Sequence, residues 1–223
     1  MTNTPKKTRA KNSNLDSVVT VDNIVELGQL LLRFSRIERV TSHEDGLRLE
    51  TDADHTVMLS VLSCAIADKL QPDLDLGKIA QYALIHDLVE TYAGDTPTIR
   101  ISEAEKLAKK KREAAALIRI NHEFGDSFPW LIKTMESYEA LDSAEARFVK
   151  GLDKLMPIIT HILNNGTYIR QIGMTKKELV ARYDQQIIEM SEYSYDTPEI
   201  MKLRDAMAQV FIEIMFPDDT KKS

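Results

Sequence analysis

The stretch Ile85–Asp95, with the sequence IHDLVETYAGD, places one imidazole and three carboxylates within ten positions, from His86 to Asp95. A mostly apolar run precedes it. If that run is helical, Glu90 lies four residues from His86 and three from Asp87, so the side chains are neighbours. Crowded carboxylates repel one another and resist burial unless a cation lies among them. The His-Asp pair offers a nitrogen and an oxygen to a divalent metal; the alternative is a helix end whose polar residues face water.

Length and composition narrow the class of protein. The chain has 223 residues, 43% hydrophobic and 29% charged, which predicts one domain with a real core. The net charge of −6 argues against a general nucleic-acid binder. No segment approaches the roughly 20 uninterrupted apolar residues of a membrane helix, and no apolar stretch follows the charged N-terminus. We therefore expect a cytoplasmic protein without a membrane partner.

The composition also predicts where the domain begins and ends. Residues 1–19 carry several basic side chains among Thr, Asn and Ser and have almost nothing to bury, so we expect a disordered basic arm. Residues 20–217 form the expected domain, and residues 218–223 form a polar tail.

Apolar residues at steps of three and four predict helices over 21–37, 53–70 and from about 76 to Gly94. Further on, helix starts are indicated by capping-box patterns at Ser102, Asp142 and Thr175 and by the Thr197-Pro198 pair. The helices expected there cover residues 102–124, 129–140, 142–164, 175–193 and 198–215. No segment shows a sustained period of two, which predicts an all-α fold in which strands are absent or trivial.

A metal site needs three or four converging ligands, and two more residues qualify. His55 opens the second predicted helix, ahead of a strongly apolar face. Asp153 lies within a segment otherwise committed to burial, and a buried aspartate without a partner is costly. Its partner is either a metal or a neighbouring lysine, Lys150 or Lys154.

These positions resemble the HD-domain metal-dependent phosphohydrolases, whose pattern is His, then His-Asp, then a distant Asp, each on a different helix. Within that superfamily the chain most resembles the 5′-deoxynucleotidase branch, which has an acid five residues before the first His and then His-Asp-x-x-Glu-x-x-x-Gly-Asp-x-Pro. Here Glu50 precedes His55, and the extended motif runs from His86 to Pro97. The resemblance covers about residues 25–165 and implies a single HD-domain helical bundle with additional C-terminal helices.

The resemblance implies a role for each matching residue. One divalent metal ion (Mn, Co, Mg, Zn or Fe) would be ligated by His55, His86, Asp87 and Asp153. Glu90 would be the acid or base of hydrolysis, and Asp95 would lie near the nucleotide sugar. Arg39 would grip phosphate. Some members follow this arginine with a tryptophan against the base or sugar, but Val40 stands here, so base recognition must differ.

The function that the resemblance implies is a 5′-nucleotidase that releases phosphate from (deoxy)nucleoside 5′-monophosphates. A bound divalent ion would suit this reaction, because it makes hydroxide available near neutral pH. The partner implied is a small phosphorylated substrate. Many members look like homodimers, and the C-terminal helices could supply that contact or simply cap the core.

Three alternatives stay open. An alarmone hydrolase of the superfamily tends to carry Glu-Asp after the His-Asp pair, but Thr91 follows Glu90 here. A deoxynucleoside triphosphate hydrolase would recruit several basic residues, and the run 109–112 is available, although it resembles the solvated face of a helix. Di-iron oxygenases of the superfamily are disfavoured, because they would need extra histidines in the motif. The third alternative is a non-catalytic helical interaction protein. The presence of every expected ligand argues against it.

Overall fold

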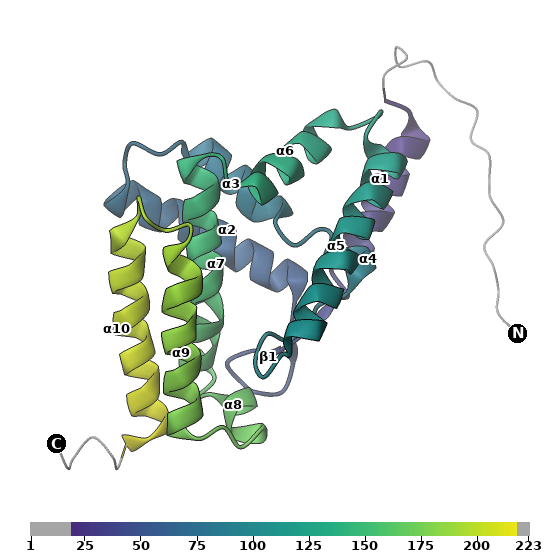
Figure 1. Cartoon of the computed structure of the whole chain (residues 1–223). Helices are drawn as coiled ribbons and strands as arrows, with labels where there is room; N and C mark the ends of the chain where they lie inside the picture. The colour runs from purple at the N-terminus through teal and green to yellow at the C-terminus, as the bar shows by residue number, and fades with distance from the viewer. Residues whose placement is uncertain (1–18, 218–223) are drawn as a thin grey trace, which may run out of the picture.

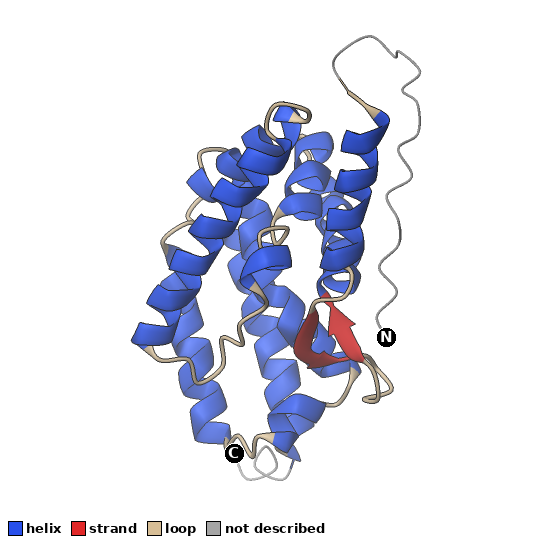
Figure 2. Cartoon of the chain, turned by 90° about the vertical axis from the view of Figure 1, so that its right-hand side faces the viewer, coloured by secondary structure: helices blue, strands red, loops and turns tan. Residues whose placement is uncertain are grey.

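The computed structural model describes residues 19–217, which form helices joined by short loops together with one small hairpin (Figures 1 and 2). Except for residue 19, the predicted basic arm lies outside the described residues, and so does the predicted tail. No helix within the described range is both long and apolar enough to cross a membrane.

The N-terminal part contains helix α1 (Val21–Phe34), strands β1 (Glu38–Ser42) and β2 (Leu49–Thr51), and helix α2 (Asp52–Leu70). The predicted first helix therefore ends three residues early, because the chain turns into the antiparallel hairpin, which pairs Glu38 with Thr51. The Thr51 side chain caps α2 and forms a capping box with Asp54. This cap fixes the start of α2, so that His55 lies in its first turn.

The predicted helix from 76 to Gly94 is broken in two, α3 (Leu76–Ile85) and α4 (Glu90–Ala93). Between them the backbone makes tight turns, in which the amide of Leu88 bonds to the carbonyl of Ile85 at 3.0 Å and the amide of Glu90 to that of Asp87 at 2.8 Å. Gly94, with φ of 72°, ends α4 in a conformation that favours glycine. The HD stretch is thus a compact turn between two helices.

The remaining helices are α5 (Glu103–Phe124), α6 (Pro129–Ala140), α7 (Ala144–Leu163), α8 (Thr167–Gln171), α9 (Lys176–Ser191) and α10 (Pro198–Met215). The capping boxes predicted at Ser102 and Thr175 are confirmed. The one predicted at Asp142 is wrong by one residue, because the Ser143 hydroxyl accepts from the amide of Ala146 at 3.1 Å. Helix α8 was not predicted.

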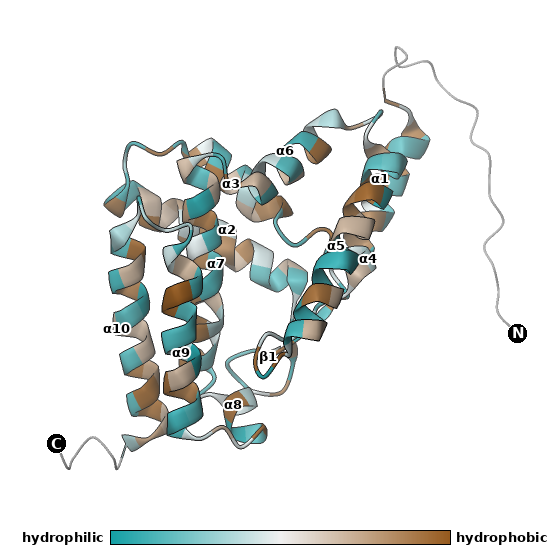
Figure 3. Cartoon of the chain, in the orientation of Figure 1, coloured by the Kyte–Doolittle hydropathy of each residue, from teal (hydrophilic) through white to brown (hydrophobic). Residues whose placement is uncertain are grey.

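The helices pack around two apolar clusters. The larger cluster joins α2, α3 and α7, with Leu59, Ile79 and Phe148 among its fully buried residues. The smaller one lies between α7 and the C-terminal helices α8 to α10, and includes Ile169 and Phe211. Apolar and polar residues alternate around α9 and α10 (Figure 3), and α10 packs against α7 and α9. Helix α7 therefore contributes to both clusters.

Candidate active site

Four side chains from distant parts of the chain meet where α2, α7 and the turn after α3 come together. The four predicted metal ligands offer one ligand atom each, and these atoms all lie within 4.8 Å of one another: His55, His86, Asp87 and Asp153. The Nε2 atom of His55 lies 3.1 Å from Oδ1 of Asp153, and Nε2 of His86 lies 3.0 Å from Oδ2 of Asp87. These four side chains therefore converge, as the sequence predicted.

The outer nitrogens of both imidazoles are held by other groups. Nδ1 of His86 lies 2.8 Å from the carbonyl oxygen of Ala83 and must donate to it, since a carbonyl can only accept. Nδ1 of His55 lies 3.4 Å from Oε1 of Glu50, and the Thr41 hydroxyl donates to the other oxygen of that carboxylate. Such contacts to the outer nitrogen are typical of histidines that bind metals, because they fix the orientation of the ring.

The inner face of the cluster fits a divalent cation. Nε2 of His86 is buried and forms no hydrogen bond, although two carboxylates lie close to it. The two carboxylate oxygens of Asp153 have different neighbours. Oδ2 accepts a hydrogen bond from the Lys154 ammonium at 2.8 Å, while Oδ1 faces both histidines. Lys154 thus pairs with only one oxygen of Asp153. The two imidazole nitrogens and the two carboxylates of the cluster together suit the metals that take mixed nitrogen and oxygen ligands.

The electrostatics also indicate a need for positive charge. Burial works against the charged form of His86, but Asp87 and Asp153 outweigh it and raise its pKa to about 10. Burial likewise opposes ionisation of Asp153, yet Lys154 and the two histidines hold its pKa well below the usual range. Both shifts favour positive charge between the imidazoles and the carboxylates, and a divalent ion held there would supply it.

A second group of acids lies beside the first and is bridged to it by Arg39. One guanidinium nitrogen, Nη1, lies 3.1 Å from Oδ1 of Asp52 and 3.0 Å from Oδ2 of Asp87. Asp52, Glu90 and Asp95 have ligand atoms within 4.8 Å of one another. Arg39 and a lysine pair with this group, but Oδ2 of Asp52 and Oε2 of Glu90 are buried without a hydrogen bond among the described residues.

That lysine is Lys109 of α5, whose Nζ lies 3.1 Å from Oε1 of Glu90. The interpretation of residues 109–112 as a solvated face is therefore wrong for Lys109. Helical spacing could have shown that Lys109 lies on the buried side of α5, because it shares a face with Ala116 and Ile120, which are buried. Glu90 itself is 1% exposed, and burial together with Asp87 raises its pKa to about 9 despite Lys109.

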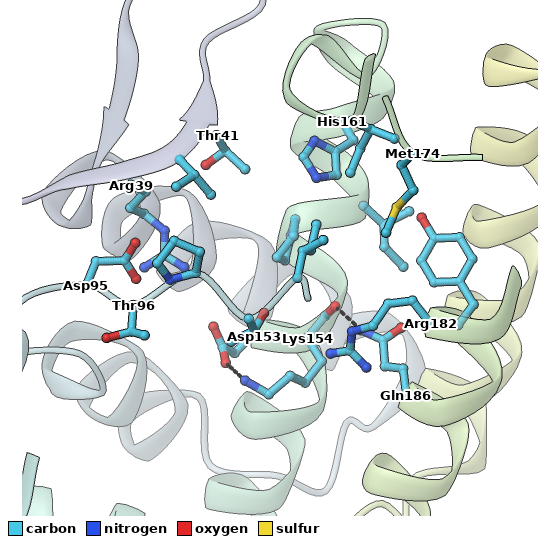
Figure 4. Close-up of a pocket in the computed structure, with 18 of the residues that line it drawn as sticks. Arg39, Thr41, Asp95, Thr96, Asp153, Lys154, His161, Met174, Arg182 and Gln186 are labelled. Atoms are coloured by element: carbon cyan, nitrogen blue, oxygen red, sulfur yellow. Dashed lines mark hydrogen bonds and ion pairs between the residues drawn. The ribbon is translucent and has the colours of Figure 1, made fainter. Parts of the chain in front are cut away.

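A cavity opens at this site and extends along α7 toward the C-terminal helices (Figure 4). We call its polar part the charged end, formed by Arg39, Asp87, Glu90, Asp95, Lys109 and Asp153. We call its other part the apolar arm, lined by Ile158, His161, Ile169, Met174, Leu179 and Tyr183. The apolar arm was missed from the sequence, because residues of α7, α8 and α9 meet there only in the folded chain.

The fold and this site define a helical protein with a buried cluster of histidines and aspartates, and the chain belongs to the HD-domain family, whose model matches residues 32–193. The chain is 30% identical to the 5′-deoxynucleotidase HDDC2 of Danio rerio over 142 residues, which cover 62% of this chain and 68% of that one. It is 33% identical to a 5′-deoxynucleotidase of Saccharomyces cerevisiae over 129 residues, 53% of this chain and 51% of the other. The matched part thus spans from about half to two thirds of these relatives.

Solved structures show the same fold. A predicted metal-dependent phosphohydrolase from Magnetospirillum magnetotacticum superposes with a TM-score of 0.69, over 87% of this chain and 96% of that one, at 22% identity. The family inferred from the motif and the all-α fold are therefore both confirmed.

Proposed function

We propose that the chain is a metal-dependent 5′-nucleotidase that releases orthophosphate from deoxynucleoside 5′-monophosphates. The observation that carries the proposal is the four-residue cluster, with Nε2 of His86 buried and without a hydrogen bond beside two carboxylates. His55, His86, Asp87 and Asp153 would hold one divalent ion. The similarity to 5′-deoxynucleotidases supports the substrate.

The residues around the cluster have separable tasks. A divalent ion held there would supply hydroxide near neutral pH and offset phosphoryl charge. Arg39 would turn its donors to the phosphate oxygens, since a guanidinium can contact them in pairs. Glu90 has a raised pKa and would hold a proton that it delivers to the departing 5′ oxygen. Asp95 would accept a hydrogen bond from a sugar hydroxyl.

A triphosphate substrate is the second candidate, because the cavity is also lined by Lys109, Lys154 and Arg182. Each of these cations already has an acidic partner within the chain: Lys109 pairs with Glu90 and Lys154 with Asp153. Arg182 lies 3.2 Å from Glu189. Arg39 is paired as well, with Asp52 and Asp87. A triphosphate would have to draw on the other three cations in addition to Arg39, so the arrangement favours a monophosphate.

We also propose a homodimer formed through the C-terminal helices, in a cytoplasmic protein. Apolar side chains on these helices are exposed, such as Ile188 (60%) on α9 and Val210 (47%) on α10. Light scattering on the full chain tests this, and a mass of one chain at all concentrations would contradict it.

The test of function is to strip the protein of metal, add back Mn, Co, Mg, Zn or Fe one at a time, and measure phosphate release. The panel holds deoxynucleoside and ribonucleoside monophosphates, deoxynucleoside triphosphates and an alarmone. We expect metal-dependent orthophosphate from deoxynucleoside monophosphates. Triphosphate or pyrophosphate release would overturn the substrate, and no turnover with any metal would overturn the proposal as a whole.

A further inference from the structure

The apolar arm continues from the charged end along one face of α7. The cavity is lined on this helix by Asp153, Lys154, Pro157, Ile158 and His161, a spacing that keeps side chains on one side of a helix. His161 lies eight residues beyond Asp153, which corresponds to about 12 Å at the helical rise per residue. That separation is comparable to the length of a mononucleotide from its phosphate to the far edge of its base.

His161 is a polar group that the proposed chemistry does not use. Its side chain is 3% exposed, and its Nδ1 atom has no hydrogen-bond partner among the described residues. The ring stacks on Phe211, with the centroids 5.5 Å apart and the planes inclined by 22°. Burial lowers the pKa of His161 to about 4, so that the ring is neutral near pH 7. An unpaired polar atom in such a place is costly unless a ligand satisfies it.

The surroundings of His161 suit a flat, uncharged ligand. Met174 lies beside it at the same end of the cavity (Figure 4), and Ile158, Ile169 and Leu179 complete the apolar wall. The Gln186 amide, which also lines the cavity, is already engaged: its nitrogen donates to the carbonyl of Lys154 at 2.9 Å, and its oxygen accepts from the Arg204 guanidinium at 3.1 Å. The His161 ring, in contrast, lines the cavity without a hydrogen bond at Nδ1 among the described residues.

We propose that the apolar arm binds the nucleobase of the substrate and that the imidazole of His161 hydrogen-bonds to the edge of the base, an inference that rests on the proposed nucleotidase function. A base is planar, largely apolar on its faces and polar along its edge, which matches apolar walls that also carry the His161 imidazole and the Tyr183 hydroxyl.

The experiment compares His161→Phe with His161→Asn in the full-length, metal-loaded enzyme. Phenylalanine keeps the volume and the stacking on Phe211 but removes the hydrogen bond, whereas the asparagine amide reaches the place of Nδ1. Each variant is assayed with deoxynucleoside monophosphates and with 2-deoxyribose 5-phosphate, which has no base. Inhibition by free deoxynucleosides, which carry no phosphate to release, provides a second readout, and direct binding of the same deoxynucleosides by calorimetry requires no turnover. His122→Asn, at an exposed histidine of α5, is the matched control.

We expect His161→Phe to lower kcat/KM for the nucleotide, relative to that for 2-deoxyribose 5-phosphate, by about tenfold, chiefly through KM. Deoxynucleosides should inhibit this variant about tenfold more weakly, and His161→Asn should recover part of both losses. If the wild type hydrolyses nucleotides but His161→Phe lowers activity on both substrates equally, the arm does not bind the base. If the wild type releases no phosphate from nucleotides, the proposed function fails instead, whatever the variants do.

Discussion

Two histidines of this protein are buried almost equally, His86 at 5% exposure and His161 at 3%, yet their pKa values move in opposite directions. Burial disfavours the charged imidazole in both. At His86 two aspartates outweigh burial and raise the pKa to about 10, whereas at His161 only the weak attraction of Glu50 opposes it, and the pKa falls to about 4. The neighbouring carboxylates therefore decide which histidine suits a cation and which suits a neutral ligand.

The largest test of this contrast is His86→Ala. We expect the variant to lose its metal and all measurable activity, because one of two nitrogen ligands is removed and the carboxylates are left unbalanced. Metal content by mass spectrometry checks the first effect. His161→Phe should keep its metal and serves as the control. A His86→Ala protein that retains one metal ion per chain would contradict the expected difference between the two histidines.

Glu90→Gln should leave the metal in place and lower kcat by about 10²- to 10⁴-fold, which is the usual contribution of a general acid or base. Glutamine preserves the shape of the side chain and cannot give up a proton to the leaving oxygen. Single-turnover kinetics on the metal-loaded variant measure the loss. Near-normal turnover would exclude Glu90 from proton transfer.

Metal binding should tighten as the pH rises. In the metal-free protein a pKa of about 10 means that His86 binds a proton near pH 7, and, despite burial, the pKa of His55 is raised by Asp153 and Glu50. A metal needs the neutral nitrogens. The apparent affinity should increase up to about tenfold per pH unit for each proton released. Calorimetry in buffers of different ionisation enthalpy counts these protons. Affinity that does not change between pH 6 and 9 would contradict the expected competition.

The smallest effect concerns stability. His161 has a folded pKa of about 4, below its unfolded value of about 6.5. The unfolded chain therefore binds the extra proton between these pH values, and the free energy of unfolding falls as the pH drops through that window. Relative to His161→Phe, the wild type should lose up to about 3 kcal/mol between pH 6.5 and 4. Urea unfolding of both proteins at each pH measures the difference, and parallel curves would show that His161 is not buried in its neutral form.

Much of the fold followed from local signals. Helices such as α2, α5 and α9 were predicted because capping residues and apolar spacing act within a few neighbouring positions. The hairpin and α8 were not predicted because both are short. The break after Ile85 was not predicted because Leu88 and Val89 continue the helical spacing of apolar residues beyond it. The four predicted ligands do converge. Their roles, like those of Glu90, Arg39 and Asp95, remain predictions.

What local patterns could not supply were contacts between distant helices. Lys109 lies in a strongly basic run that looks solvated, and only the packing of α5 beside α4 brings it to Glu90. Nothing in the sequence distinguishes His161 from other residues of the helix predicted over 142–164, but its Nδ1 has no partner among the residues the structure describes. Both departures arise at the cavity, where tertiary contacts decide the environment of a side chain.

Helix α7 carries Asp153 at the charged end and His161 in the apolar arm, and its two sides pack into different clusters. The opposite wall of the arm comes from α8, α9 and the turn between them, none of which supplies a residue of the His/Asp cluster. Descendants of such a chain can alter that wall by insertion or substitution while α7 keeps the cluster intact. Evolution can then exchange one substrate for another without reinventing the reaction.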